Sequence, residues 1–147
     1  MTSDEIIAQL PYEQPFLFVD ELESISESGI RGSYTFPADA FFYKGHFKNN
    51  PITPGVILTE AMAQIGVVCL GIFLLQEQIK NNANLQIALT SSQVDFFLPV
   101  KPEEKITVIS DKEYFRFNKL KCKVSIENRN KEIVCRGVIS GMIQSVS

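Results

Sequence analysis

The second half of the chain alternates polar and apolar positions in the manner of β-strands. From Lys119 to Val124 the period is two, with lysines on one side and apolar residues on the other. Residues 128–131, Asn-Arg-Asn-Lys, have the composition of a turn. Segments rich in β-branched and aromatic residues predict strands over 85–98, 106–110, 120–126 and 133–143. We therefore predict a run of antiparallel strands.

The first half of the chain predicts shorter elements. Thr2 and Glu5 fit a capping box, so a short helix is expected to begin there and to end at Pro11. The apolar run 16–19 predicts a strand. Alternation over residues 30–36 predicts another strand, ending at Pro37.

The longest apolar segment, residues 56–79, predicts a helix that is apolar on nearly all sides. Its uninterrupted apolar run, from Ile65 to Leu75, has eleven residues. A membrane span needs about 20, so we expect no membrane association and a helix wrapped by the rest of the protein. The order of elements predicts an α+β fold, a single domain over residues 1–147 in which one antiparallel sheet curls around one helix.

Composition narrows the class of protein. A chain of 147 residues with a net charge of −3 gives no sign of nucleic-acid or anionic-membrane binding. The acidic N-terminus lacks a signal-peptide pattern. The three cysteines, Cys69, Cys122 and Cys135, are widely spaced in apolar contexts, which predicts reduced core residues of a cytoplasmic protein. With one histidine and no Cys-x-x-Cys pair, no metal site is expected.

His46, the one histidine, is the first candidate for catalysis. It lies in a segment rich in Asn and Pro, which predicts a loop, where functional residues concentrate. Its unperturbed pKa, about 6.5, suits a general base at neutral pH, although a lone histidine is more often structural.

Glu60 and Gln64 are four residues apart, so they share one face of the predicted helix. Apolar neighbours would raise the pKa of Glu60, whereas the nearby helix N-terminus would lower it, and the sequence leaves this balance open. A solvated first turn is the alternative. Gln64 is placed to hydrogen-bond Glu60.

Pro54 and Gly55 predict the start of this helix, with Thr53 as N-cap and Pro54 in the first turn. The free N–H of Gly55 would then lie at the positive end of the helix, where it can hold a carbonyl oxygen that gains negative charge. A tight helix start that requires small residues is a compatible alternative.

Motifs that match a known family extend over nearly the whole chain: Leu10-Pro11, Pro15–Asp20, Gly45-His46-Phe47, Pro51, Pro54-Gly55-Val56, Glu60–Gln64 and Val94–Pro102. With these motifs the chain resembles the 3-hydroxyacyl-[acyl carrier protein] dehydratase family, with its hotdog fold. Glutamate at position 60, rather than aspartate, resembles the branch that only dehydrates.

The resemblance implies an enzyme without cofactor that converts (3R)-hydroxyacyl thioesters on acyl carrier protein to trans-2-enoyl thioesters, in fatty-acid or related lipid or polyene biosynthesis. It implies His46 as the base that takes the α-proton and Glu60 as the acid that protonates the departing hydroxyl. Gly55 would hold the thioester carbonyl, and Gln64 is expected to help bind substrate. It also implies a homodimer, or a larger even assembly, in which His46 works with Glu60 of a second subunit.

The chain departs from the family pattern in four places. Tyr12-Glu13-Gln14 stands where His-Arg-Tyr is usual, Lys48 replaces proline, Thr53 replaces methionine, and Phe97-Leu98 replaces arginine. These departures concern acyl specificity and carrier docking. The densest basic cluster, Lys112, Arg116, Lys119, Lys121 and Lys123, is a candidate docking surface, with a solvated sheet face as the alternative.

Two other functions fit the same features. A hotdog thioesterase would share fold and substrate class but release a free acid. A non-catalytic acyl-carrier-binding subunit of a biosynthetic complex would have no need of both His46 and Glu60.

Overall fold

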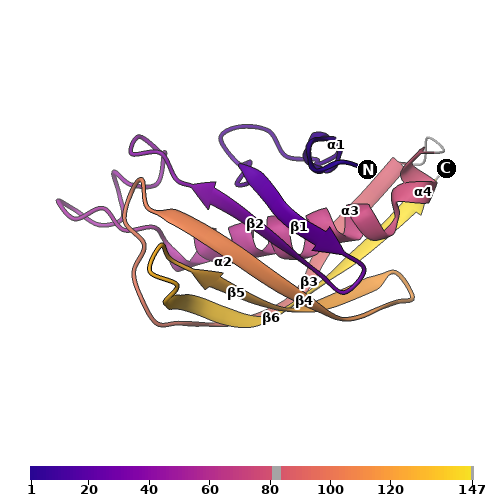
Figure 1. Ribbon diagram of the computed structural model, residues 1–147. Helices are drawn as coiled ribbons and strands as arrows, with labels where there is room; N and C mark the ends of the chain where they lie inside the picture. Colours follow the sequence, from indigo (N-terminus) through magenta and orange to yellow (C-terminus); the bar gives the residue numbers. More distant parts are fainter. Residues whose placement is uncertain (81–83, 147) are drawn as a thin grey trace.

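The computed structural model describes residues 1–80 and 84–146. Six antiparallel strands form one sheet in the order β1-β2-β4-β5-β6-β3. They are β1 (Glu21–Ser26), β2 (Gly29–Thr35), β3 (Asn84–Phe96), β4 (Lys105–Arg116), β5 (Lys119–Glu127) and β6 (Ile133–Val146). Figure 1 shows the sheet curving around a helical rod, which confirms the predicted α+β hotdog architecture.

The prediction that β5 buries one face and exposes the other is confirmed. Leu120, Cys122 and Val124 are buried against the helix side of the sheet, and the lysines between them point outward. The structure also contains β1, which the sequence reading missed. This strand lies at an edge and buries little besides Leu22, so its pattern carries a weak apolar signal.

The short N-terminal helix α1 (Ser3–Ala8) begins with the predicted capping box. Thr2 accepts a hydrogen bond from the Glu5 backbone N–H at 3.2 Å. The predicted strand over residues 16–19 is wrong, because this segment is irregular. The Phe18 N–H donates to the side chain of Gln64 and the Phe16 carbonyl accepts from it, so neither group pairs with a neighbouring strand.

The central rod is composite. α2 (Gly55–Ala63) continues into a π-helical turn, η1 (Gln64–Cys69), then α3 (Leu70–Leu74), and α4 (Gln76–Lys80) follows after a break at Leu75. The predicted helix over 56–79 is therefore in the right place, but it consists of several helical segments and not of one continuous helix.

The π-helical turn packs closely against the sheet. The Gly66 carbonyl accepts a hydrogen bond from Ser110 Oγ of β4 at 2.8 Å, so a buried backbone acceptor is satisfied. A Cβ at position 66 would lie 3.0 Å from Val124 Cγ1 and 3.1 Å from Ser110 Cβ. Glycine thus lets helix and sheet approach each other.

The length argument against a membrane span needs correction. Residues Gly55–Leu74 form 20 helical residues that are apolar enough to cross a bilayer by length and composition. Burial argues against a span, because 78% of the 18-residue apolar window within this segment is buried inside the protein. The rod is therefore a core helix.

Candidate active site

The loop between β2 and α2 carries His46, and two residues of this loop, Ile52 and Phe47, contact its imidazole. His46 Nδ1 lies 2.9 Å from the carbonyl oxygen of Ile52. The Ile52 N–H donates back to the His46 carbonyl at 2.8 Å, and the ring stacks on Phe47 with centroids 3.9 Å apart. A carbonyl oxygen only accepts, so Nδ1 carries the proton. The lone pair on Nε2 is then free to act as a base.

Gly55 is the first residue of α2. Its N–H therefore has no acceptor within the helix and lies at the positive end of the helix dipole. A Cβ at this position would meet the Phe96 ring at 3.1 Å, so only glycine fits without moving that ring. The predicted N-cap was wrong: Pro54 occupies that position, and the Thr53 hydroxyl bonds Tyr43 instead.

Glu60 is half-buried on α2, and its carboxylate accepts a hydrogen bond from Gln64 Nε2 at 3.0 Å. Burial raises the pKa of the Glu60 carboxyl above its usual range, and the bond from Gln64 offsets part of that rise. Burial thus outweighs the hydrogen bond from Gln64 in setting this pKa. A carboxyl with a raised pKa is suited to give up a proton near neutral pH.

Gln64 is fully buried, and its amide is engaged in three directions. Nε2 donates to Glu60 and to the Phe16 carbonyl (2.9 Å), and Oε1 accepts from the Phe18 N–H (2.8 Å). Both amide hydrogens are therefore used inside the chain. Gln64 links the carboxylate to the irregular segment before β1.

Tyr12 lies near the site, although the sequence indicated it only as a departure from the family pattern. Together with Glu60 it lines a cavity of about 40 Å³, whose other walls are apolar residues of the central rod and of β3, with Gly141. Burial, and then the Glu60 charge, raise the pKa of Tyr12 to about 12, so its hydroxyl keeps its proton. In the sequence, the one sign that Tyr12 lies near the site is that it directly follows Leu10-Pro11, a part of the family signature.

The structure brings some predicted site residues together within the chain and not others. Glu60 and Gln64 are joined, and Gly55 begins the helical rod that carries both. Across the two described stretches, 1–80 and 84–146, no hydrogen bond or ion pair connects His46 to Glu60. The same residues contain no group of three or more potential metal ligands.

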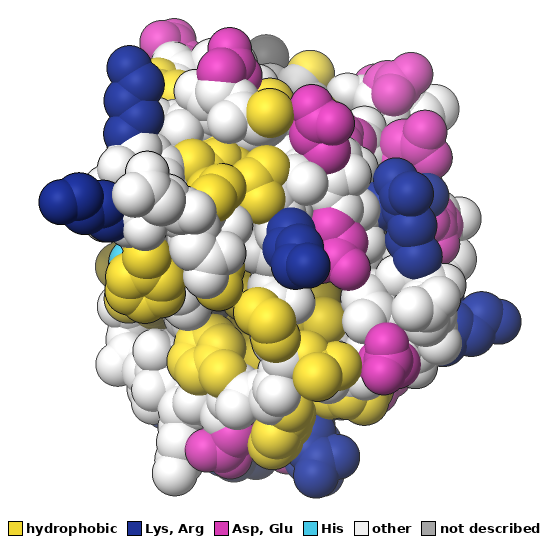
Figure 2. All heavy atoms as spheres, turned by 90° about the vertical axis from the view of Figure 1, so that its left-hand side faces the viewer, with side chains coloured by type: hydrophobic (Ala, Val, Ile, Leu, Met, Phe, Trp, Pro, Cys, Tyr) yellow, Lys and Arg dark blue, Asp and Glu magenta, His cyan; other side chains and the backbone are white. Residues whose placement is uncertain are grey.

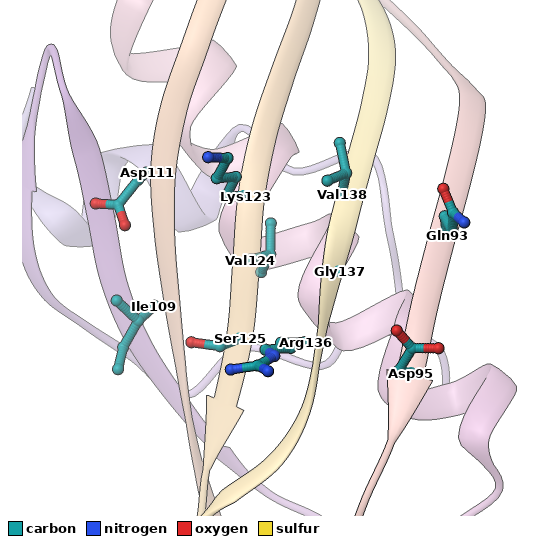
Figure 3. Close-up of a pocket in the computed structure, with 10 residues that line it drawn as sticks. All are labelled: Gln93, Asp95, Ile109, Asp111, Lys123, Val124, Ser125, Arg136, Gly137 and Val138. Atoms are coloured by element: carbon teal, nitrogen blue, oxygen red, sulfur yellow. The ribbon is translucent and has the colours of Figure 1, made fainter.

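Two surface features differ in how close they lie to the predicted site residues. Figure 2 shows the end of the molecule at which α2 begins. Apolar side chains gather there among scattered charges. The exposed apolar residues of the His46 loop and of the first turn of α2 are Phe41, Phe47 and Val56. A shallow hollow of about 340 Å³ lies elsewhere, across β4, β5, β6 and β3. Figure 3 shows that charged and polar side chains such as Asp95, Asp111 and Arg136 line it, and it contains none of the predicted site residues.

Comparison with known proteins supports the resemblance. The model of a family described as "FabA-like domain" matches residues 10–129. The chain belongs to this family. It is 30% identical over 135 residues to the 3-hydroxyacyl-[acyl-carrier-protein] dehydratase FabZ of Caldicellulosiruptor bescii, covering 91% of this chain and 92% of the relative. The enzyme of the same name from Caldicellulosiruptor saccharolyticus is 33% identical over 137 residues, covering 90% and 91%.

Solved structures confirm the fold of this FabA-like protein. The dehydratase heterocomplex ApeI:P from Xenorhabdus doucetiae superimposes with a TM-score of 0.78 at 12% identity, covering 97% of this chain and 91% of that one. A hypothetical thioesterase with coenzyme A from Streptococcus pneumoniae gives a TM-score of 0.62 at 15% identity, with 86% of each chain covered. At such identities these likenesses concern the fold alone.

Proposed function

We propose that residues 1–147 form a dehydratase that converts (3R)-hydroxyacyl thioesters on acyl carrier protein to trans-2-enoyl thioesters. The observation that carries this proposal is the 2.9 Å contact between His46 Nδ1 and the Ile52 carbonyl, because a carbonyl only accepts and Nε2 is then left as the base. Relatives that cover nine-tenths of the chain bear the name of such dehydratases, which supports the assignment.

The reaction needs three groups. Nε2 of His46 takes the α-proton, while the Gly55 N–H stabilises the negative charge that develops on the thioester oxygen. Glu60 donates a proton to the β-hydroxyl, which leaves as water as the Cα=Cβ bond forms. One C–H bond and one C–O bond break, no electrons are lost or gained overall, and no cofactor takes part. His46 and Glu60 return to their starting states by proton exchange.

The distribution of these groups supports a site shared by two subunits. His46 and Glu60 are not joined within the described chain, whereas Glu60 lies near β3, the edge strand. β3 exposes Leu89 and Phe96, so its free edge is suited to pairing with a second copy. We propose a homodimer or larger even assembly that acts in the cytoplasm, where the three buried cysteines stay as free thiols.

A direct assay separates the candidate functions. Purified protein is incubated with a 3-hydroxyacyl thioester, and enoyl absorbance, loss of water by mass, and free thiol are followed together. We expect enoyl product without free thiol. Thiol release without enoyl product would identify a thioesterase, and tight carrier binding without either product would identify a non-catalytic acyl-carrier-binding subunit.

The structure changes the expected carrier-docking surface. Lys121 and Lys123 each lie 3.6 Å from Glu113, which compensates part of their charge. The turn between β4 and β5 lies at the end of the sheet opposite the His46 loop (Figure 1). Lys44 and Lys48, by contrast, are exposed on either side of His46 in the chain. We therefore propose Lys44 and Lys48 as carrier contacts.

Charge reversal at both loop lysines (K44E with K48E) is expected to raise KM for a carrier-bound substrate and to leave KM for a small pantetheine thioester unchanged. The matched control reverses Lys121 and Lys123. A rise in KM for the control pair alone would restore the outer basic cluster as the docking surface.

A further inference from the structure

Two buried hydroxyl groups within the loop that carries His46 are hydrogen-bonded to each other. Tyr43 is 5% exposed and Thr53 is 3% exposed. Their hydroxyl oxygens are 2.6 Å apart, which is a short hydrogen bond between neutral groups. Neither residue belongs to the predicted catalytic set, and Thr53 stands where the resembled family usually has methionine, which offers no hydroxyl.

The peptide unit between Ile52 and Thr53 connects this hydroxyl pair to the imidazole. Its carbonyl, on Ile52, is the acceptor for His46 Nδ1 at 2.9 Å. Its N–H, on Thr53, donates to the carbonyl of Val100 at 2.8 Å. Because a peptide unit is planar, the direction of the carbonyl is set once the N–H and the Thr53 Cα are held.

The Tyr43 hydroxyl supplies the restraint on Thr53. Val100, the partner of the Thr53 N–H, is fully buried, so the backbone side of the residue is fixed by the core. The side chain is fixed by Tyr43, whose own ring is packed against Phe42 with centroids 4.6 Å apart. Burial raises the pKa of Tyr43, and it therefore stays neutral and able to share a proton with Thr53 at working pH.

We propose that Tyr43 and Thr53 are positioning residues that hold the Ile52 carbonyl against Nδ1–H of His46 and thereby keep Nε2 unprotonated and correctly aimed. This role rests on the proposed function, since it acts on the proposed base. Neither hydroxyl needs to touch the substrate, because both are buried and act through one peptide group.

The test uses hydroxyl deletions, Tyr43→Phe and Thr53→Val, with Thr53→Ser as the conservative variant that keeps the hydroxyl. We expect kcat to fall about five- to tenfold in both deletion variants with little change in KM, as suits the loss of one buried hydrogen bond. The double variant should cost no more than the worse single one, because both remove the same bond. Thr53→Ser should restore most of the rate.

One readout separates positioning from a merely structural role. The Ile52 carbonyl accepts from Nδ1 and so holds the proton on that nitrogen, and loosening this contact should change which ring nitrogen carries the proton. His46 is the one histidine in the chain, so ¹⁵N-labelled histidine reports its tautomer without ambiguity. The deletion variants should show a larger share of the Nε2–H tautomer.

The outcomes are distinct. A wild-type tautomer in both folded deletion variants would overturn the positioning role and leave the dehydratase assignment standing. A shifted tautomer in the deletion variants, combined with a wild-type protein that turns over no thioester, would uphold the positioning role and remove the proposed function. If thermal melting shows that Thr53→Val is unfolded, Tyr43→Phe alone decides, since it removes one oxygen and keeps the ring.

Discussion

Replacing His46 by alanine is expected to lower kcat for dehydration by about 10²–10⁴, because the α-proton of a thioester is weakly acidic and no other base occupies this loop position. Glu60→Gln is expected to cause a loss of the same order, since an amide cannot protonate the departing hydroxyl. Steady-state kinetics on a carrier-bound 3-hydroxyacyl substrate measures both losses. Retention of turnover in either variant would remove that residue from the mechanism.

Stability provides the control for Glu60→Gln. The folded-state pKa of Glu60 lies above its usual value, so the folded protein keeps a proton that the unfolded chain has already lost. The free energy of unfolding therefore falls as pH rises from the pKa of the unfolded chain to the higher pKa of the folded protein. Above that range the charged carboxylate destabilises the folded state. The glutamine variant should melt no lower than wild type at pH 7, and its advantage should shrink toward pH 4.

Mixing the two inactive variants tests the shared site. A dimer with one His46→Ala subunit and one Glu60→Gln subunit contains one site with both groups intact if the site spans two subunits. Unfolding and refolding an equal mixture should then restore about a quarter of wild-type activity. If both groups came from one subunit, every site would carry a lesion and the mixture would stay inactive.

Gln64→Leu is expected to combine a large loss of rate with a loss of stability. The substitution leaves the Phe18 N–H buried without its partner, which costs about 1–3 kcal/mol. It also removes the hydrogen bond that Gln64 donates to the Glu60 carboxylate, so we expect kcat to fall by about 10–100-fold. Urea unfolding and steady-state kinetics measure the two effects.

The pH profile identifies the cause of the rate loss in Gln64→Leu. The hydrogen bond from Gln64 lowers the pKa of Glu60, so its removal should raise that pKa further and move the alkaline limb of the profile to higher pH. Gln78→Leu, on the exposed face of α4 (Gln76–Lys80), is the matched control and should change neither limb. An unmoved alkaline limb in Gln64→Leu would show that Gln64 does not govern Glu60.

Several features could be predicted from the sequence because they depend on local patterns. The alternation around Cys122 fixes which face of β5 is buried, and Thr2 with Glu5 suffices to start α1. Glu60 and Gln64 share a helix face by spacing alone, so their hydrogen bond could be anticipated.

Other features depend on contacts between distant segments. The run 16–19 has the composition of a strand, yet its backbone groups are bonded by a side chain 46 residues away. Thr53 resembles an N-cap in sequence, but Tyr43 lies close enough to take its hydroxyl. Local patterns contain no information about which polar group will come within 3 Å after the chain has folded.

The sequence by itself determined the class of fold, the apolar rod, and the residue types at positions 46, 55 and 60 on which the proposed acid–base chemistry rests. The tertiary structure decided how these residues are tuned. It placed the Ile52 carbonyl against His46, set the raised pKa of Glu60 through burial, and fixed Gln64 between two segments. Burial and hydrogen-bond partners arise only when distant segments pack together, and these control the protonation states on which the reaction depends.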